Sequence, residues 1–374
     1  MVVRLGDYIE EYSVRNKDSE DIPVYSVTNT QGFCQDYFGK EVASKDKSTY
    51  KIVPRGCFAY NPSRINVGLI DWQRNEERVI VSPLYNVFSV SPRLDQQYLY
   101  YFLKSDVALQ RIKVVATGSV RDNLKFDKLC EFPINYVELD EQRVITHTLD
   151  KIKHLKELLQ NEIDELDTLI KARFVEMFGD LIINPYGYAK YELRETCKVI
   201  TGNTPSRDTK EYYGDFMEWI KTDNIVAGRT YPTKAAEFLS EEGVAVGRTV
   251  DEGAILMACI AGSVASIGRV CITDRKVAFN QQINAIVPRD YDTRFLYVML
   301  QIAKEYLVEE INMSLKGILS KSKLEDKMFY IPPMDIQKEF SMFVQQVDKS
   351  KAVIQKALDE TQLLFDSLMQ EYFG

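Results

Sequence analysis

Two long stretches of the chain place apolar residues every 3.5 positions. In the second stretch, the apolar series runs through positions 340, 347, 354, 361 and 368 and, interleaved with them, 344, 351, 358, 365 and 372. A 3.5-residue spacing held for more than four heptads is typical of a coiled-coil helix. The first stretch has the same pattern 195 residues earlier, from Ile145 to Met177. We therefore predict two long helices that pack against each other in antiparallel orientation.

Each predicted helix carries one lysine at the same position of its apolar seam. These are Lys156 and Lys351. A polar residue in a coiled-coil seam can fix the register of the helices at some cost in stability. Alternatively, the lysine stem packs in the seam while its ammonium group reaches water. The sequence favours the second interpretation without excluding the first.

The two helices belong to a longer internal repeat with a period of 195 residues. The second copy ends at Gly374, and the match covers about 60 positions without a gap. Upstream of this region the similarity is looser, as in two modules that share a fold but differ in their loops. Identities in this register include Ser119 with Ser314, Leu124 with Leu319, Gln142 with Gln337, Lys156 with Lys351, and Phe178-Gly179 with Phe373-Gly374.

The repeat divides the chain into four parts, with a variable module before each helix. We expect modules at 1–139 and 180–334 and helices at 140–179 and 335–374. Each module reads as mixed α/β, and the repeat predicts a pseudo-two-fold arrangement. The predicted strands are Val79–Val81, Val87–Val90, Ala254–Ile260, Arg269–Ile272 and Gln282–Val287, and the predicted helical stretches are Gln96–Val114 and Thr293–Glu310.

Composition and charge narrow the class of protein. The 374 residues are 45% hydrophobic and 27% charged, as in an ordinary globular protein. No apolar run is long enough to cross a membrane, and the N-terminus does not resemble a secretory signal, so we expect a cytoplasmic protein. The net charge is −8. It divides along the four parts as 0, −3, −2 and −3, so a local basic face on either module remains possible.

Signatures of catalysis are missing from the sequence. There is no G-x-x-x-x-G-K-[ST] phosphate loop, and Gly262–Gly268 reads better as a turn between strands. Neither Asn61-Pro62-Ser63 nor Asn184-Pro185-Tyr186 matches the Asn-Pro-Pro-aromatic element of an amino-methyltransferase. Two histidines and six scattered cysteines do not suggest a metal site. The motif search therefore favours a binding protein, although it leaves acid or thiol chemistry open.

Candidate binding residues in the second module follow a polar loop with aromatic residues behind it. The loop reads Thr201-Gly-Asn-Thr-Pro-Ser-Arg207 and precedes Tyr212-Tyr213-Gly214 and Trp219-Ile220. Amide, hydroxyl and guanidinium groups can reach phosphates or base edges. The alternative for any one of them is a capped turn. The candidates are Asn203, Thr204, Ser206, Arg207, Lys221 and Asn224.

The first module offers a counterpart at Ser26–Gly32, which aligns with Lys221–Ile225 in the 195-residue register. Its candidates are Asn29, Thr30 and Gln31, followed by Arg64 and Asn66 beside Gly68. A further matched pair of segments, around residues 117–121 and 314–317, could bind DNA or simply connect a helix to a strand. Its candidates are Ser119, Arg121, Ser314 and Lys316.

The four-part plan, the Gly-x-Thr-Pro-Ser loop backed by Tyr-x-Gly and Trp-Ile, and the Phe-Gly helix ends resemble the specificity subunit of type I restriction-modification systems. The resemblance covers essentially the whole chain, although the first module lacks the Thr-Pro-Ser loop. It implies that each module is a target-recognition domain that reads one half of a bipartite sequence in double-stranded DNA. It also implies that the helices set the spacing of the half-sites and dock two methyltransferase subunits, which two restriction subunits can join. S-adenosylmethionine, ATP and Mg would then be bound by the partner subunits, and this chain would itself have no catalytic residues and bind no metal or cofactor.

Other classes of function remain open at the level of sequence. One is a coiled-coil scaffold whose modules bind protein or glycan. Another is the specificity chain of a fused restriction-methylation enzyme, and a third is an enzyme whose active site shows no recognisable motif. Sequence-selective and salt-dependent binding to duplex DNA would separate the first of these from a DNA-recognition subunit.

Overall fold

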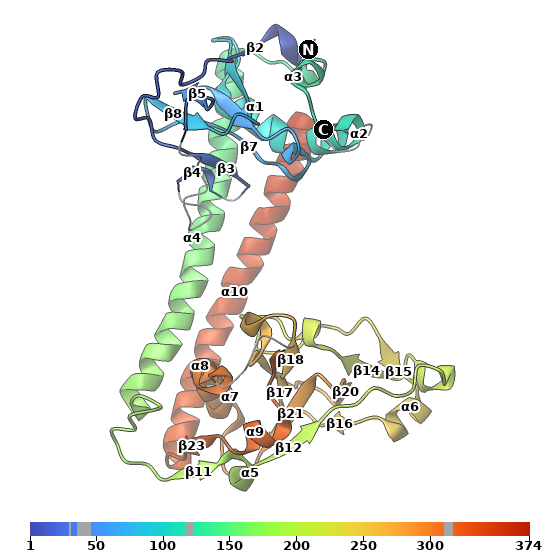
Figure 1. The fold of residues 1–374 in the computed structure, drawn as a ribbon. Coiled ribbons are helices and arrows are strands. Elements are labelled where there is room, and N and C mark those ends of the chain that lie inside the picture. The colour runs from blue at the N-terminus through green and yellow to red at the C-terminus, as the bar shows by residue number, and fades with distance from the viewer. Residues whose placement is uncertain (30, 36–45, 117–122, 310–316) are drawn as a thin grey trace. The chain divides into compact units, whose positions relative to one another are not determined.

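The computed structural model describes residues 1–29, 31–35, 46–116, 123–309 and 317–374. The chain divides into two compact units (Figure 1). Unit 1 comprises Met1–Gln160 and Gln355–Gly374, and unit 2 comprises Asn161–Ile354. Each unit therefore contains one module of the repeat together with a portion of both long helices.

The two long helices are α4 (Leu139–Phe178) and α10 (Met334–Phe373). Pro332-Pro333 directly precede α10, where their fixed backbone angle and missing N–H end the incoming strand. Gly179 follows α4 with φ +75°, a left-handed conformation that glycine adopts at the end of a helix. Both helices were predicted from the apolar spacing and are confirmed.

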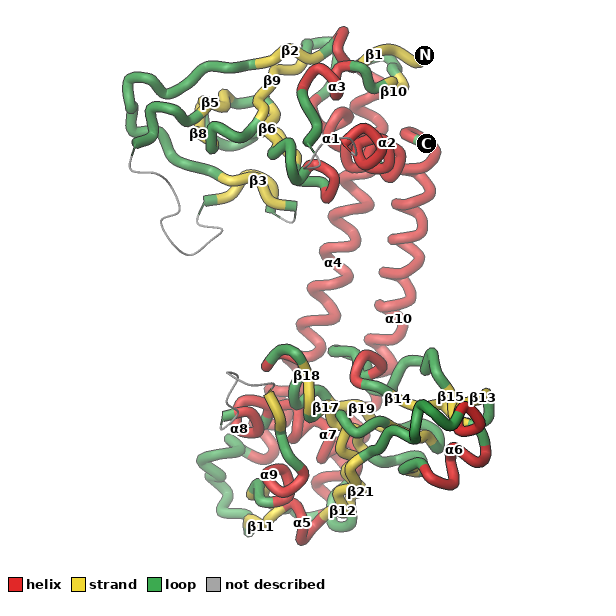
Figure 2. Tube along the Cα trace, turned by 45° about the vertical axis from the view of Figure 1, so that its right-hand side comes forward, coloured by secondary structure: helices red, strands yellow, loops and turns green. Residues whose placement is uncertain are grey.

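The apolar seam predicted from the sequence is the buried face of both helices. Each predicted seam position is buried or half-buried. In unit 2, the ring of Phe340 in α10 lies 5.6 Å from Phe174 and 5.4 Å from Phe178 in α4. In unit 1, Lys156 Nζ of α4 lies 5.1 Å from the ring of Phe365 in α10. In unit 2 the end of α4 meets the start of α10, and in unit 1 the first half of α4 meets the last turns of α10, which is antiparallel packing. Figure 2 shows the two helices side by side.

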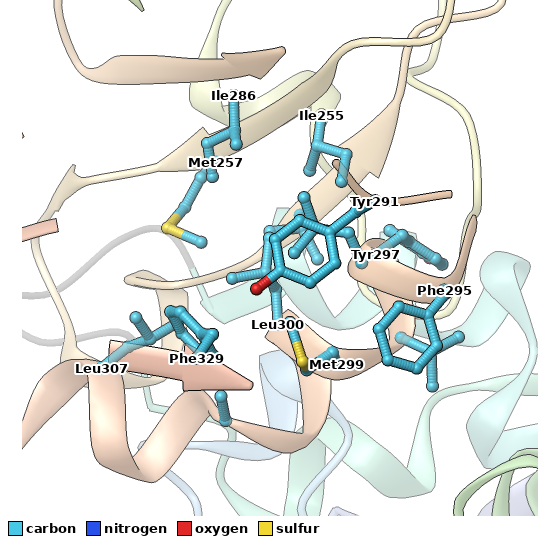
Figure 3. Close-up of a cluster of buried hydrophobic side chains, with 14 of the residues drawn as sticks. Ile255, Met257, Ile286, Tyr291, Phe295, Tyr297, Met299, Leu300, Leu307 and Phe329 are labelled. Carbon is cyan, nitrogen blue, oxygen red and sulfur yellow. The ribbon is translucent and has the colours of Figure 1, made fainter. Parts of the chain in front are cut away.

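A four-stranded antiparallel sheet forms the centre of unit 2. Its order is β12-β21-β17-β19. Helix α7 packs against it, and Figure 3 shows side chains from the helix and from β17 and β21 meeting in one apolar cluster. The bounds are β12 (Cys197–Thr201), β21 (Ile283–Pro288), β17 (Ile255–Ala258), β19 (Val270–Ile272) and α7 (Thr293–Ile302).

A second sheet of unit 2 carries the predicted binding loop. Its order is β13-β15-β14-β20-β16, with β14 and β20 parallel and the other pairs antiparallel. Smaller pairs, β11 with β23 and β18 with β22, complete the unit. The bounds are β13 (Tyr213–Gly214), β15 (Phe238–Leu239), β14 (Met217–Ile220), β20 (Val277–Phe279), β16 (Thr249–Val250), β11 (Lys190–Glu192), β23 (Met328–Tyr330), β18 (Ile260–Ala261), β22 (Gly317–Ile318), α5 (Leu193–Thr196), α6 (Glu241–Val246), α8 (Lys304–Val308) and α9 (Lys321–Glu325).

Unit 1 repeats the central sheet of unit 2 in the order β2-β9-β6-β7. The pair β1 with β10 corresponds to β11 with β23, and α1 and α3 correspond to α7 and α9. The mixed α/β fold and the internal repeat are thus confirmed. The bounds are β1 (Val2–Arg4), β2 (Ile9–Glu11), β3 (Ser26–Thr28), β4 (Gly32–Cys34), β5 (Lys51–Pro54), β6 (Phe58–Tyr60), β7 (Ile70–Trp72), β8 (Arg78–Val81), β9 (Asn86–Val90), β10 (Pro133–Asn135), α1 (Gln96–Lys104), α2 (Asp106–Ala116) and α3 (Phe126–Cys130).

The two shorter helical stretches are interrupted where the sequence pattern predicted continuous helices. Ser105 separates α1 from α2 with ψ 152°, and its Oγ accepts a hydrogen bond from the N–H of Ala108 at 3.3 Å. The serine therefore caps a new helix. In unit 2, Ala303 separates α7 from α8 with ψ 4°, which interrupts the helical ladder. Among the described residues, no helix is both long and apolar enough to span a membrane.

Candidate nucleic-acid interface

The polar loop of unit 2 begins with a glycine that lies directly on a neighbouring turn. A Cβ atom at Gly202 would lie 2.1 Å from the carbonyl oxygen of Asn280. The Gly202 N–H donates to the carbonyl of Ile283 at 3.0 Å, and the Asn203 N–H donates to that of Phe279 at 3.2 Å. Because a larger residue would be driven into backbone, only glycine permits this close approach.

Two aromatic side chains hold the loop from behind. Tyr213 Oη donates to the carbonyl of Pro205 at 2.7 Å, and the indole N–H of Trp219 donates to the carbonyl of Asn203 at 3.3 Å. Their rings lie 6.0 Å apart and meet edge to face. The aromatic support predicted from the sequence is thus present, and it fixes the backbone of the loop rather than its side chains.

Arg207 and Lys221 form a cluster with Glu237 on this aromatic pair. The Arg207 guanidinium lies 4.4 Å from the ring centre of Tyr213 and 5.1 Å from that of Trp219. Lys221 Nζ lies 5.1 Å from the same indole. Both cations bind Glu237, Arg207 at 2.7 Å to Oε2 and Lys221 to Oε1. We call Arg207, Lys221 and Glu237 the charged cluster.

Glu237 was not among the residues singled out from the sequence, because a strand pairing brings it to the site. Strand β14 pairs with β15, and the N–H of Trp219 donates to the carbonyl of Glu237 at 3.0 Å. The hydrogen bond from Lys221 lowers the pKa of the Glu237 carboxyl, and that from Arg207 lowers it further. No sequence spacing signals this contact.

Thr204 and Ser206 lie exposed on the loop. Thr204 Oγ1 hydrogen-bonds to Oε1 of Gln281, an exposed residue between β20 and β21. Ser206 Oγ accepts the N–H of Asp208 at 3.3 Å. The polar run Asn280-Gln281-Gln282 between two apolar strands was the only sequence signal for Gln281.

The side-chain amides of the two asparagine candidates in unit 2 are engaged within the protein. Asn203 Nδ2 donates to the carbonyl of Val246 at 2.9 Å, and its Oδ1 accepts the N–H of Arg248 at 2.7 Å. Asn224 is 8% exposed. It accepts the N–H of Lys221 at 2.9 Å and donates to Thr233 Oγ1 and to a backbone carbonyl. These contacts favour the capped-turn alternative for both asparagines.

In unit 1 the hairpin β3–β4 presents Asn29 and Gln31. Both are exposed, and Asn29 Oδ1 accepts a hydrogen bond from Lys104 Nζ at 2.9 Å. Lys104 also donates to the carbonyl of Gly68, so the hairpin, helix α1 and the turn at Gly68 are brought together. Burial lowers the pKa of Lys104. A Cβ at Gly68 would lie 3.0 Å from Asn29 Oδ1, so the small residue makes room for the contact.

For the remaining candidates of unit 1, the structure gives the position and the exposure of Arg64 and Asn66. Arg64 is exposed and directly precedes the short turn Ile65–Val67. Asn66 lies in this turn and is half-buried. Five candidates, namely Thr30, Ser119, Arg121, Ser314 and Lys316, lie outside the described residues. Their role as DNA contacts remains a prediction.

Arg74 of unit 1, like Lys104, is a cationic residue that the sequence did not single out. The Arg74 guanidinium lies 4.4 Å from the ring of Trp72 and 5.3 Å from that of Tyr100, and Nη1 binds Asp71 at 2.9 Å. Each of the two tryptophans of the chain thus carries a stacked arginine that is paired with an acid. Within the described parts of the chain, no group of three His, Cys, Asp or Glu residues is placed to hold a metal ion.

Comparison with known families gives one clear match. A family model described as the type I restriction modification DNA specificity domain matches residues 4–168 and 185–361. The HindI specificity subunit of Haemophilus influenzae is 32% identical over 120 residues, 31% of this chain and 25% of that subunit. The match therefore spans a quarter of the HindI subunit. The MjaIX specificity subunit of Methanocaldococcus jannaschii is 24% identical over 298 residues, 73% of this chain and 67% of that subunit.

Two solved structures show the same fold across the whole chain. The S subunit of a type I restriction-modification system from M. genitalium aligns with a TM-score of 0.57 and 15% identity, covering 100% of this chain and 96% of that one. A chain from a structure described as the basis of complex assembly and conformational transition of the type I system aligns at 0.59 and 17%, covering 100% and 97%. Because the family model matches both copies of the repeat, the chain belongs to the type I restriction-modification DNA specificity family, whose members recognise DNA sequence and are not catalytic.

Proposed function

We propose that this chain is the specificity subunit of a type I restriction-modification complex and that each unit reads one half of a bipartite DNA target. One observation carries the proposal. The two units share the order of the central sheet and one flanking strand pair, yet they expose different loops. Unit 2 presents the loop of Gly202 to Arg207, whereas unit 1 presents the hairpin of Asn29 and Gln31. Two copies of one fold with different surface groups suit two half-sites of different sequence.

In this proposal the long helices set the spacing of the half-sites and dock two methyltransferase subunits, which two restriction subunits can join. Apolar side chains outside the seam support a docking role, since such exposed residues on a helix suit contacts with another protein. Leu158 is 50% exposed on α4, and Leu363 is 69% exposed on α10. S-adenosylmethionine, ATP and Mg belong on the partner subunits.

The net charge of −8 fits a chain that binds DNA together with partners. Affinity for DNA depends on neutralising phosphates, and partner subunits can supply part of that positive charge. In this proposal the chain contributes recognition of the DNA sequence rather than most of the phosphate-neutralising charge. We place it in the cytoplasm, where the DNA and a methyltransferase would meet it.

Long-read mapping of modified adenines tests the proposal. DNA from cells that express the chain with its methyltransferase is compared with DNA from cells that express the methyltransferase alone. We expect a two-part motif, interrupted by a spacer of fixed length, only when the chain is present. A methyltransferase that is active without producing any new motif would favour the scaffold alternative.

A further inference from the structure

We propose that Glu237 sets the sequence discrimination of unit 2 by weakening phosphate contacts of Arg207 and Lys221 more than their contacts with base edges. This inference rests on the proposed function, because it assigns a role within the loop surface that would read DNA. The side-chain contacts of Glu237 are with Arg207 and Lys221 rather than with the backbone of the loop. It acts instead on the two cations that lie over the loop supports.

The geometry makes one carboxylate the partner of two cations. Arg207 binds Oε2 of Glu237 and Lys221 binds Oε1, so both oxygens are occupied. The side chains of Arg207 and Glu237 are 54% and 35% exposed, and that of Lys221 is 30% exposed. The charged cluster therefore has a net charge of +1 where the two cations alone would have +2, and it faces solvent.

The position of the cluster couples it to the loop. Both cations lie over the indole of Trp219, and Arg207 also lies over Tyr213. These are the two side chains that hydrogen-bond to the loop carbonyls of Asn203 and Pro205. Arg207 at the end of the loop and Lys221 beside it are thus held at defined places rather than extended freely into solvent.

A carboxylate at this place acts differently on the two kinds of DNA contact. Attraction between a cation and a phosphate is an interaction of full charges, so an added negative charge opposes it directly. A hydrogen bond from arginine to a guanine edge involves a neutral base and depends mainly on geometry. Glu237 therefore lowers non-specific affinity more than specific affinity, and the ratio of the two increases.

The test compares Glu237→Gln with the wild type in the complete complex with methyltransferase subunits. Binding is measured to a duplex with the mapped motif and to one whose unit 2 half-site is scrambled, between 50 and 200 mM salt. We expect Glu237→Gln to bind the scrambled duplex about 3- to 10-fold more tightly at low salt, with a smaller change for the motif duplex. The salt dependence for the scrambled duplex should steepen by up to about 0.9 in the slope of log K against log salt.

Glu211→Gln provides the matched control. Glu211 is exposed on the short turn before Tyr213, and the ion pairs of the described residues do not include it. This variant removes the same charge from the same region without touching the two cations. It should leave the discrimination between the two duplexes close to that of the wild type.

Several outcomes would overturn the inference. Equal effects of Glu237→Gln and Glu211→Gln would mean that only the net charge matters. A loss of binding to the motif duplex alone would mean that Glu237 reads a base itself. A lower melting temperature with weaker binding to both duplexes would mean that Glu237 supports the fold.

The variant Arg207→Ala tests the proposed function separately. The proposed function predicts that this variant relaxes the unit 2 half-site in the methylation map and leaves the other half-site intact. If that result is obtained while Glu237→Gln behaves otherwise than expected, only the inference about Glu237 fails.

Discussion

Gln337 accepts the backbone N–H of Asp292 at its Oε1 atom, at a distance of 2.9 Å. Its Nε2 donates to the carbonyl of Pro332 at 2.7 Å, and the side chain is fully buried. Asp292 in turn caps helix α7. Gln142 makes the same contacts in unit 1, accepting the N–H of Asp95 at 2.7 Å. In both copies one glutamine thus ties the start of a long helix to the capped start of a module helix.

Replacing Gln337 by methionine should destabilise unit 2 by about 2–4 kcal/mol. The methionine keeps the length of the side chain but leaves the Asp292 N–H and the Pro332 carbonyl buried without partners. Urea unfolding measures the loss. Hydrogen exchange should show faster exchange of the Asp292 amide.

Gln345→Met is the control, because Gln345 is exposed on the same helix. It should change the free energy of unfolding by less than about 0.5 kcal/mol. Equal stability of the two variants would show that the buried amide contributes nothing beyond its volume.

The regular parts of the fold could be predicted because their signal is local and periodic. The apolar seam and the repeat identify both helices, and the expected bounds of 140–179 and 335–374 lie within one residue of the observed ends. The repeat also marked Gln142 and Gln337 as identical. It could not give their role, since the backbone N–H groups that the two glutamines accept lie more than 40 positions away.

The parts that could not be predicted depend on contacts between distant segments. Glu237 reaches Arg207 only because β15 pairs with β14.

The contacts of the two seam lysines, Lys156 and Lys351, also depend on segments that are distant in the sequence. In unit 2, Lys351 binds Asp167 at 2.6 Å, a charged contact suited to fixing register. In unit 1, Lys156 lies over the ring of Phe365 instead, so identical residues in the repeat have different partners.

Gly32→Ala should disturb the hairpin that presents Asn29 and Gln31. Gly32 has φ +64°, and a Cβ would lie 1.9 Å from Oδ2 of Asp71. That oxygen also accepts the N–H of Phe33 at 3.3 Å. We expect a loss of about 1–3 kcal/mol and a relaxed unit 1 half-site, measured by unfolding and by methylation mapping.

Gly56→Ala is the control for backbone strain alone. Gly56 has φ +85° in the same unit, but the nearest atom to its added Cβ is 3.7 Å away. It should cost about 1 kcal/mol without changing the motif. A changed unit 1 half-site in both variants would attribute the effect to stability rather than to the hairpin.

The stability of unit 2 should respond to pH through Asp348. Burial raises the pKa of this carboxyl, and the nearby Arg294 and Lys351 offset only part of that effect. A raised pKa in the folded state means that the folded protein binds the proton more tightly, so this group adds stability as the pH falls from neutral towards about 3.8.

Asp348→Asn should therefore be at least as stable as the wild type at pH 7. The difference should shrink as the pH is lowered, because the wild-type carboxyl then becomes neutral as well. Thermal unfolding of both proteins between pH 4 and 7 gives the measurement. A variant whose disadvantage grows with pH would mean that the ion pair with Arg294 outweighs the burial of the carboxylate.

Inserting one heptad into each long helix should lengthen the spacer of the methylated motif. The insertions follow Glu157 in α4 and Thr361 in α10, close to the contact between Lys156 and Phe365. A whole heptad returns the apolar residues to the seam and adds about 10 Å to each helix. At roughly 3.4 Å per base pair this corresponds to about three base pairs. Replacing a heptad without changing the length should leave the motif as it was. Methylation mapping should show both half-sites unchanged and farther apart, and an unaltered spacer in the lengthened variant would contradict the role of the helices as a ruler.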